Sequence, residues 1–141
     1  MNGPGFDEAS ADVEFSIESG AHVAASISVE LSAPEAGTIR YTLDGSKPQG
    51  NDPAYSSAIR ISNATVVTAR LFAAGKLPGR SLNKSYIMLS TQLRNVTSNL
   101  PIVLIDTFSN SVGQNNYTNA FVEMIETTND RAAITDAPDF S

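Results

Sequence analysis

The chain has 141 residues, of which 41% are hydrophobic and 17% charged, enough for one compact domain with an apolar core. Its net charge of −6 and pI near 4.6 argue against binding to nucleic acid or to anionic lipid. It has no cysteine, which excludes disulfides, thiolate metal sites and cysteine nucleophiles, and no apolar run long enough to span a membrane.

The first segment, residues 1–9, is expected to be a disordered leader. The start MNGPGFDEASADVEF has neither a basic n-region nor an apolar h-region. We therefore expect no signal peptide within this chain.

Apolar and polar residues then alternate in six short runs, which predicts half-buried strands. The runs are VEFSIE, ISVELS, TIRYTLD, YSSAIRIS, TVVTARLF and SLNKSYIML. The residues expected to point inward and form the core are Phe15, Ile17, Val29, Leu31, Tyr41, Leu43, Ile59, Val67, Ala69 and Tyr86. Residues 10–90 are thus predicted to fold as an antiparallel β-sandwich of about seven strands, with an immunoglobulin or fibronectin-III-like architecture. Phe72 has the opposite phase and is a possible interface residue.

A tight turn is predicted in the stretch IRYTLDGSKP. Asp44 can accept hydrogen bonds from the backbone two residues on, Gly45 can adopt a positive φ, and Pro48 ends the strand ladder. Asp44, Asn51 and Asp52 also carry oxygen donors of the kind that calcium uses. Their spacing lacks the alternating ligand pattern of a calcium loop and Lys47 lies among them, so turn formation is the favoured interpretation.

These features resemble a known family. The turn YTLDGSKP, Tyr55 with Ile59, the run TVVTARLF and Tyr86 are similar to the fibronectin-III-like, chitobiase/β-hexosaminidase C-terminal type domain over about residues 13–88. The resemblance implies an accessory or spacer unit without catalysis, belonging to a larger secreted or surface bacterial protein. It implies an extracellular or cell-envelope location, neighbouring domains as partners and no cofactor.

The remainder differs in pattern. Residues 91–99 are predicted to be a linker, and residues 100–141 a short β-rich extension, the incomplete start of a following domain. Ile102, Val103, Leu104 and Ile105 form a continuous apolar run, typical of a strand buried on both faces. A further strand over residues 120–126 and a turn at Asn129-Asp130 are also expected. Because this apolar strand would be exposed without the rest of its sheet, we expect it to dock on the sandwich, to pair with a second copy as a homodimer, or to stay disordered.

The same tail, at residues 100–107 and 130–140, is similar to the entry segment of spore-coat protein H (CotH) type kinase domains. This resemblance implies an alternative function, the N-terminal fragment of a kinase-like protein that is inactive alone. The family's phosphate-binding motifs have no counterpart in the sequence.

No catalytic or metal site is predicted. His22, the only histidine, is expected in a loop or rim without an orienting partner, and Lys76 and Arg80 are expected as ordinary surface cations. A carbohydrate-binding module is a second alternative. It would need exposed aromatic rings, yet Trp is absent and Tyr41, Tyr55, Phe15 and Tyr86 follow the apolar phase.

Overall fold

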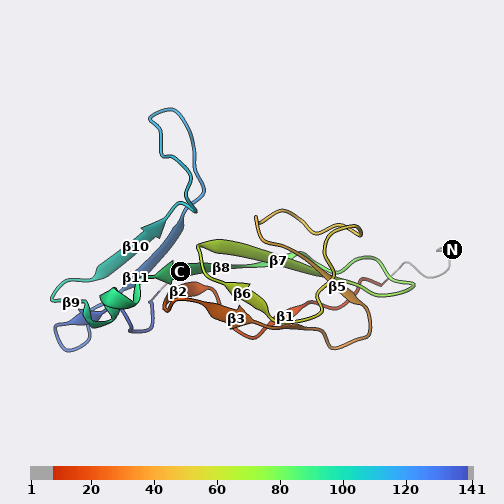
Figure 1. Cartoon of the computed structure of the whole chain (residues 1–141), viewed down its shortest axis with the longest axis horizontal. Helices are drawn as coiled ribbons and strands as arrows, with labels where there is room; N and C mark the ends of the chain where they lie inside the picture. Colours follow the sequence, from red (N-terminus) through yellow and green to blue (C-terminus); the bar gives the residue numbers. More distant parts are fainter. Residues whose placement is uncertain (1–7, 140–141) are drawn as a thin grey trace. The chain divides into compact units, whose positions relative to one another are not determined.

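The computed structural model describes residues 8–139, and most of the predicted leader lies outside this range. Nearly all its elements are strands (Figure 1), which confirms the predicted all-β sandwich class. The strands are β1 (Glu14–Phe15), β2 (Gly20–Val23), β3 (Ile27–Val29), β4 (Leu31–Ser32), β5 (Thr38–Thr42), β6 (Ile59–Ile61), β7 (Thr65–Phe72), β8 (Leu82–Leu89), β9 (Thr97–Ser98), β10 (Ile102–Asp106), β11 (Phe121–Ile125) and β12 (Ala132–Ala133). One short 3-10 helix, η1 (Thr91–Asn95), accompanies them in the described part. Within residues 8–139, no helix has the length and apolarity that crossing a membrane requires.

The chain divides into two compact units, each built from several segments of the sequence. Among the described residues, unit 1 comprises residues 8–18, 28–60 and 66–84, and unit 2 comprises residues 19–27, 61–65 and 85–139. The stretch expected to be a linker, residues 91–99, contains η1 and β9 and belongs to unit 2.

Unit 1 contains the antiparallel pairs β1–β4 and β5–β7. The register of the second pair runs from Thr38 opposite Phe72 to Thr42 opposite Thr68. Alternate residues of β7 point into an apolar core, in which Val67, Ala69 and Leu71 are completely buried. Other buried apolar residues of this unit are Val13, Val29, Leu31 and Ile59.

Some residues expected in the core are less buried than the pattern suggested. Phe15, Ile17 and Tyr41 are half-buried, whereas Leu43 is 49% exposed. Strand β5 ends at Thr42, so the alternation no longer applies one residue later, where the chain has entered the turn. Leu43 is therefore corrected from a core residue to an exposed one.

Unit 2 contains a pairing that departs from the expected antiparallel arrangement. Strand β2 runs parallel to β8, with Gly20 opposite Tyr86 and Val23 opposite Leu89. Tyr86 is fully buried, as expected for a core residue. Strand β9 pairs with β12, and positive φ angles at Asn129 and Asp130 make the turn that precedes β12.

The tail of the chain forms a hairpin of β10 and β11, with Ile102 opposite Ile125 and Asp106 opposite Phe121. The prediction that β10 is buried on both faces is wrong. Val103 and Ile105 are 53% and 68% exposed, while Ile102 and Leu104 are half-buried. A two-stranded sheet covered on one side leaves its other face open, so one half of the apolar run lies in solvent.

Candidate functional site

The turn after β5 is built by its own side chains. The Asp44 carboxylate accepts hydrogen bonds from the backbone N–H of Ser46 at 2.9 Å and from its hydroxyl at 2.6 Å, and these bonds lower the pKa of Asp44. Gly45 has a φ of 80° and donates its N–H to the carbonyl of Val66 at 3.2 Å. Pro48 is completely buried. The carboxylate therefore shapes the turn.

Two of the side chains considered as calcium donors, Asp44 and Asp52, accept backbone hydrogen bonds in turns. Asp52 accepts a hydrogen bond from the backbone N–H of Gln49 at 2.6 Å, so its carboxylate also closes a turn. Asp44 and Asp52 line an open hollow of about 430 Å³ with Tyr41, and Asn51 is not part of it. Among residues 8–139, no three carboxylate or imidazole groups lie close enough to hold a metal ion.

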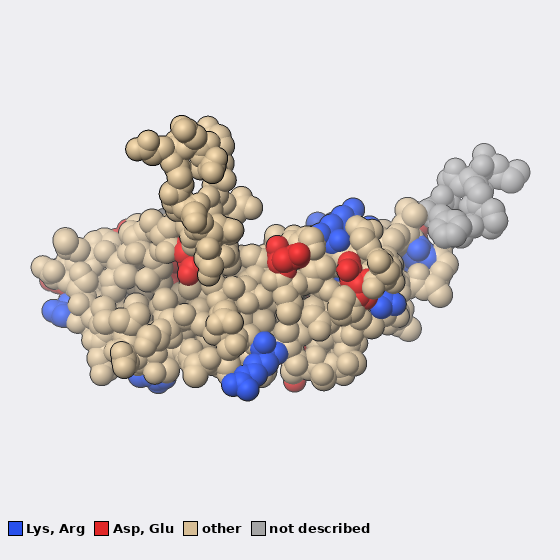
Figure 2. All heavy atoms as spheres, turned by 45° about the horizontal axis from the view of Figure 1, so that its top comes forward, with Lys and Arg blue, Asp and Glu red and all other residues tan. Residues whose placement is uncertain are grey.

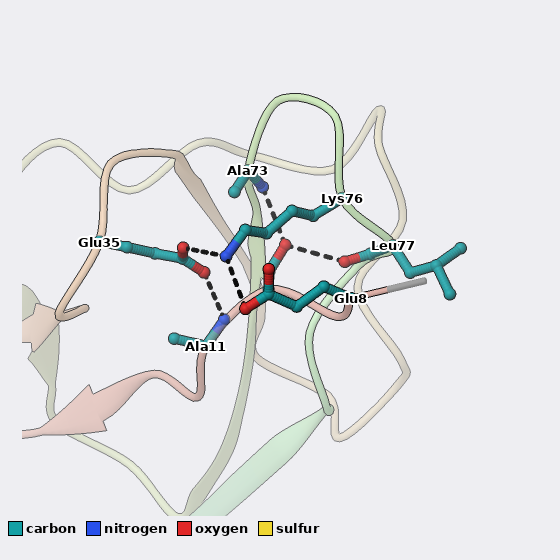
Figure 3. A network of polar contacts seen from close by, with 7 residues as sticks. Glu8, Ala11, Glu35, Ala73, Lys76 and Leu77 are labelled. Carbon is teal, nitrogen blue, oxygen red and sulfur yellow. Dashed lines mark hydrogen bonds and ion pairs between the residues drawn. The ribbon is translucent and has the colours of Figure 1, made fainter. Parts of the chain in front are cut away.

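An ion-pair network around Lys76 lies in unit 1 (Figure 3). The Lys76 ammonium lies 2.7 Å from Glu35 Oε2 and 3.3 Å from Glu8 Oε1. Glu35 Oε1 also accepts a hydrogen bond from the backbone N–H of Ala11 at 2.6 Å. The bond to Lys76 lowers the pKa of Glu35, and Glu35 in turn raises the pKa of Lys76. Lys76 is thus engaged in fixing the start of the described chain.

Ser10 completes this network from the same segment. Its hydroxyl donates to the carbonyl of Leu77 at 2.8 Å and accepts from the backbone N–H of Ala73 at 3.0 Å. Ser10 is 5% exposed. Residues 8–11 are therefore held against the loop that follows β7 by both backbone and side-chain bonds.

Three cations meet around a hollow of about 400 Å³ in unit 1, which we call the cationic pocket. Lys47, Arg70 and Arg80 line it, and the rest of the wall is made by Ala9, Pro78, Gly79 and Ser81. This grouping could not be predicted from the sequence, because the three cations are separated by 23 and 10 positions. One feature of the sequence indicates an outward-facing cation: Arg70 alternates with the apolar residues of the run that forms β7.

Two of these cations are held by fixed partners. Arg70 Nε donates to the carbonyl of Gly79 at 2.6 Å, and its guanidinium lies 5.5 Å from the centre of the Phe72 ring. Arg80 makes two hydrogen bonds to the Asp12 carboxylate, which lower the pKa of Asp12 and raise the pKa of Arg80. Phe72, a predicted interface residue, is half-buried and contacts the Arg70 guanidinium.

His22 lies in strand β2, and the expectation of a loop or rim position is corrected. Its Nε2 is buried without a hydrogen-bond partner in the described structure, and its ring centre is 6.1 Å from that of Tyr86. A nearby hollow of about 290 Å³ in unit 2 is also lined by Arg94 and Asp136. Thr135 supplies a hydroxyl group to the lining of this hollow, and none of the described groups forms a hydrogen bond with the imidazole Nε2 that would orient it as a base.

Comparison with known proteins found a family model that matches part of the chain. Residues 17–82 match the family model of the chitobiase/beta-hexosaminidase C-terminal domain, which lies within the resemblance expected over residues 13–88. In chitobiase that domain is a non-catalytic accessory domain. The CotH-like interpretation of the tail is not supported. Searches of curated proteins and of solved structures returned no match.

Proposed function

We propose that this chain acts as a non-catalytic accessory and spacer unit in a larger secreted or surface protein. The observation that carries the proposal is the match of residues 17–82 to an accessory domain. A spacer must keep its shape under load from its neighbours and needs no reactive group. The packing of the described residues bears on the first requirement, stiffness, and their polar groups bear on the second, the lack of a reactive group.

The packing of unit 1 supports a stiff body. Val29, Val67, Ala69 and Leu71 have no exposed surface, and protein interiors of this kind are packed as densely as organic crystals. A body that resists deformation fixes the distance between the segments attached to it.

The polar groups of unit 1 support the same function. Four of its carboxylates make hydrogen bonds or ion pairs that stabilise the fold. Asp12 and Glu35 pair with cations, while Asp44 and Asp52 accept backbone N–H bonds in turns. A general acid or base needs a carboxylate free to exchange a proton with substrate. These four groups are committed to other contacts.

The spacer function is tested by replacing residues 13–88 in the full-length protein with a Gly/Ser linker of equal residue number. Such linkers behave as flexible coils. We expect a broader distribution of distances between the flanking domains in small-angle scattering, with unchanged turnover of a small soluble substrate by any neighbouring enzyme. An unchanged distance distribution would contradict the spacer function, and so would lost turnover.

Carbohydrate binding is a second candidate, and a single loop favours it. The loop between β10 and β11, residues 107–120, has no charged residue and projects from its hairpin (Figures 1 and 2). Tyr117 is fully exposed, and a hollow of about 650 Å³ beside it is lined by Asn110, Ser111, Asn115, Asn116, Thr118 and Asn119. Amide side chains both donate and accept hydrogen bonds, as hydroxyl groups require, and an exposed ring can pack on a sugar face.

The strand aromatics considered from the sequence give no such surface, since Tyr86 is fully buried and Phe15, Tyr41 and Tyr55 are half-buried. A glycan-array measurement with the wild type and Tyr117→Ala tests the loop. Neutral glycan binding that is lost in the variant would support this candidate. Absence of binding by the wild type would reject it without affecting the spacer function.

A further inference from the structure

We propose that the cationic pocket of unit 1 binds a tetrahedral dianion of the phosphate type, either free or carried as a phosphomonoester. This goes beyond the spacer function, which requires no ligand. The pocket and the whole chain differ in the sign of their charge. The chain carries a net charge of −6, yet Lys47, Arg70 and Arg80 line one hollow of about 400 Å³.

The free donors of the pocket match an oxyanion. Arg70 uses only Nε in its bond to Gly79, so its two terminal nitrogens have no hydrogen-bond partner among residues 8–139. Arg80 uses Nε and Nη2 on Asp12, which leaves Nη1, and the Lys47 ammonium has no partner in the described structure. Terminal guanidinium nitrogens and an ammonium are the groups that bind phosphate oxygens in proteins.

The charge of the site indicates a dianion. Three cations line the hollow, and the carboxylate of Asp12 neutralises the charge of Arg80, which leaves two positive charges. A phosphomonoester carries between one and a half and two negative charges near neutral pH. A singly charged carboxylate would leave one cation of the pocket without a counter-charge.

One arginine of the pocket, Arg70, is positioned in advance. Its guanidinium is fixed by the Gly79 carbonyl at 2.6 Å and by the Phe72 ring at 5.5 Å. Donors held in place before binding lose less conformational entropy when the ligand arrives. Arg70 also lies directly opposite Arg40 on β5, whose own guanidinium donates to the carbonyl of Asp52 at 2.8 Å. Like charges at opposed positions destabilise a sheet, so a bound anion would relieve this repulsion.

The experiment titrates inorganic phosphate, sulfate and acetate into the whole chain at constant ionic strength and follows amide shifts by NMR. We expect saturable shifts at residues 47, 70 and 79–81 with phosphate and sulfate. Lys47→Gln and Arg70→Gln should weaken both affinities by roughly tenfold or more, as expected for lost charged hydrogen bonds. Arg60→Gln is the matched control, because Arg60 is exposed on β6 and lies outside the pocket.

Three results would overturn the proposal. The first is absence of saturable binding of both dianions by the folded wild type. The second is an equal loss of affinity in Arg60→Gln, which would show that only the general field of the protein acts. The third is acetate binding as tightly as phosphate, which would contradict the charge assignment. Since the Lys47 ammonium has no partner among residues 8–139, Lys47→Gln keeps the test valid if Arg70→Gln fails to fold.

Discussion

Two antiparallel strand pairs, each containing a strand rich in apolar residues, differ in how many of those residues are buried. In β5 and β7 of unit 1, Val67, Ala69 and Leu71 are fully buried, and the opposite face of β7 carries the buried Thr68 and the half-buried Arg70 and Phe72. In β10 and β11 of unit 2, Val103 and Ile105 remain mostly exposed. An apolar run therefore predicts a strand, while the extent of burial depends on what covers each face.

The largest effect is expected when a buried residue of the β5–β7 pair and an exposed residue of the β10–β11 pair are each replaced by alanine. Leu71→Ala should lower the free energy of unfolding by about 2–5 kcal/mol, because it leaves a cavity in a packed core. Ile105→Ala should change it by no more than about 0.5 kcal/mol, since its side chain is 68% exposed. Urea unfolding followed by circular dichroism measures both. Equal effects of the two substitutions would show that the face of β10 is covered in solution.

A smaller effect is expected at Gly79, where the chain passes close to another backbone segment. A Cβ at this position would lie 2.8 Å from the carbonyl oxygen of Ala11 and 2.9 Å from that of Ser10. Gly79→Ala should therefore destabilise the protein by about 1–3 kcal/mol, as overpacking does. Gly50→Ala is the control, because a Cβ at Gly50 would have no neighbouring atom within 4 Å among the described residues. Equal stability of the two variants would rule out the close approach.

A local effect is expected where Glu35 fastens residues 8–11. Glu35→Ala removes the acceptor of the Ala11 N–H and the main partner of Lys76. The amide of Ala11 should then exchange its hydrogen faster, with little change in the exchange of β7. Glu30→Ala serves as the matched control, since Glu30 is exposed and its side chain has no partner in the described residues. Unchanged exchange at Ala11 in Glu35→Ala would contradict the tether.

The smallest effect expected is a pH dependence of the same segment. The pKa values of Asp12 and Glu35 are lowered in the folded state, so their contribution is fully present above the ordinary values of 3.8 and 4.5. It is lost as the pH falls through the lower folded values. Lys76 has a raised pKa, so its contribution persists until the pH rises through a value above 10.5. Amide NMR shifts of residues 8–12 should be constant from pH 6 to 9 and change on acidification below about pH 4. A transition near neutral pH would contradict these assignments.

Local features were predictable from sequence because they depend on neighbouring residues. The strand β11 and the turn at Asn129-Asp130 follow from alternation and from residues that tolerate a positive φ. Asp44 and Gly45 adopt the hydrogen bonding and the φ angle that their residue types favour.

Features made by distant segments were not predictable. The parallel pairing of β2 with β8 joins residues more than sixty positions apart, and nothing in either run specifies direction. The cationic pocket likewise depends on how the turn after β5, strand β7 and the loop after it meet. Tyr117 was not predictable as an exposed ring, because it lies in an uncharged loop where no alternation of apolar and polar residues indicates which side chains are buried.

The most direct test of the accessory function is a turnover measurement with the purified chain on a chromogenic β-N-acetylhexosaminide. We expect no hydrolysis above the buffer rate for the wild type. Glu123 of β11 is 3% exposed, and its Oε2 accepts a hydrogen bond from the backbone N–H of Ala21 in β2 at 3.1 Å. Hydrolysis that disappears in Glu123→Gln or His22→Ala, with the fold retained, would show that the groups near β2 are catalytic and would contradict a purely accessory function.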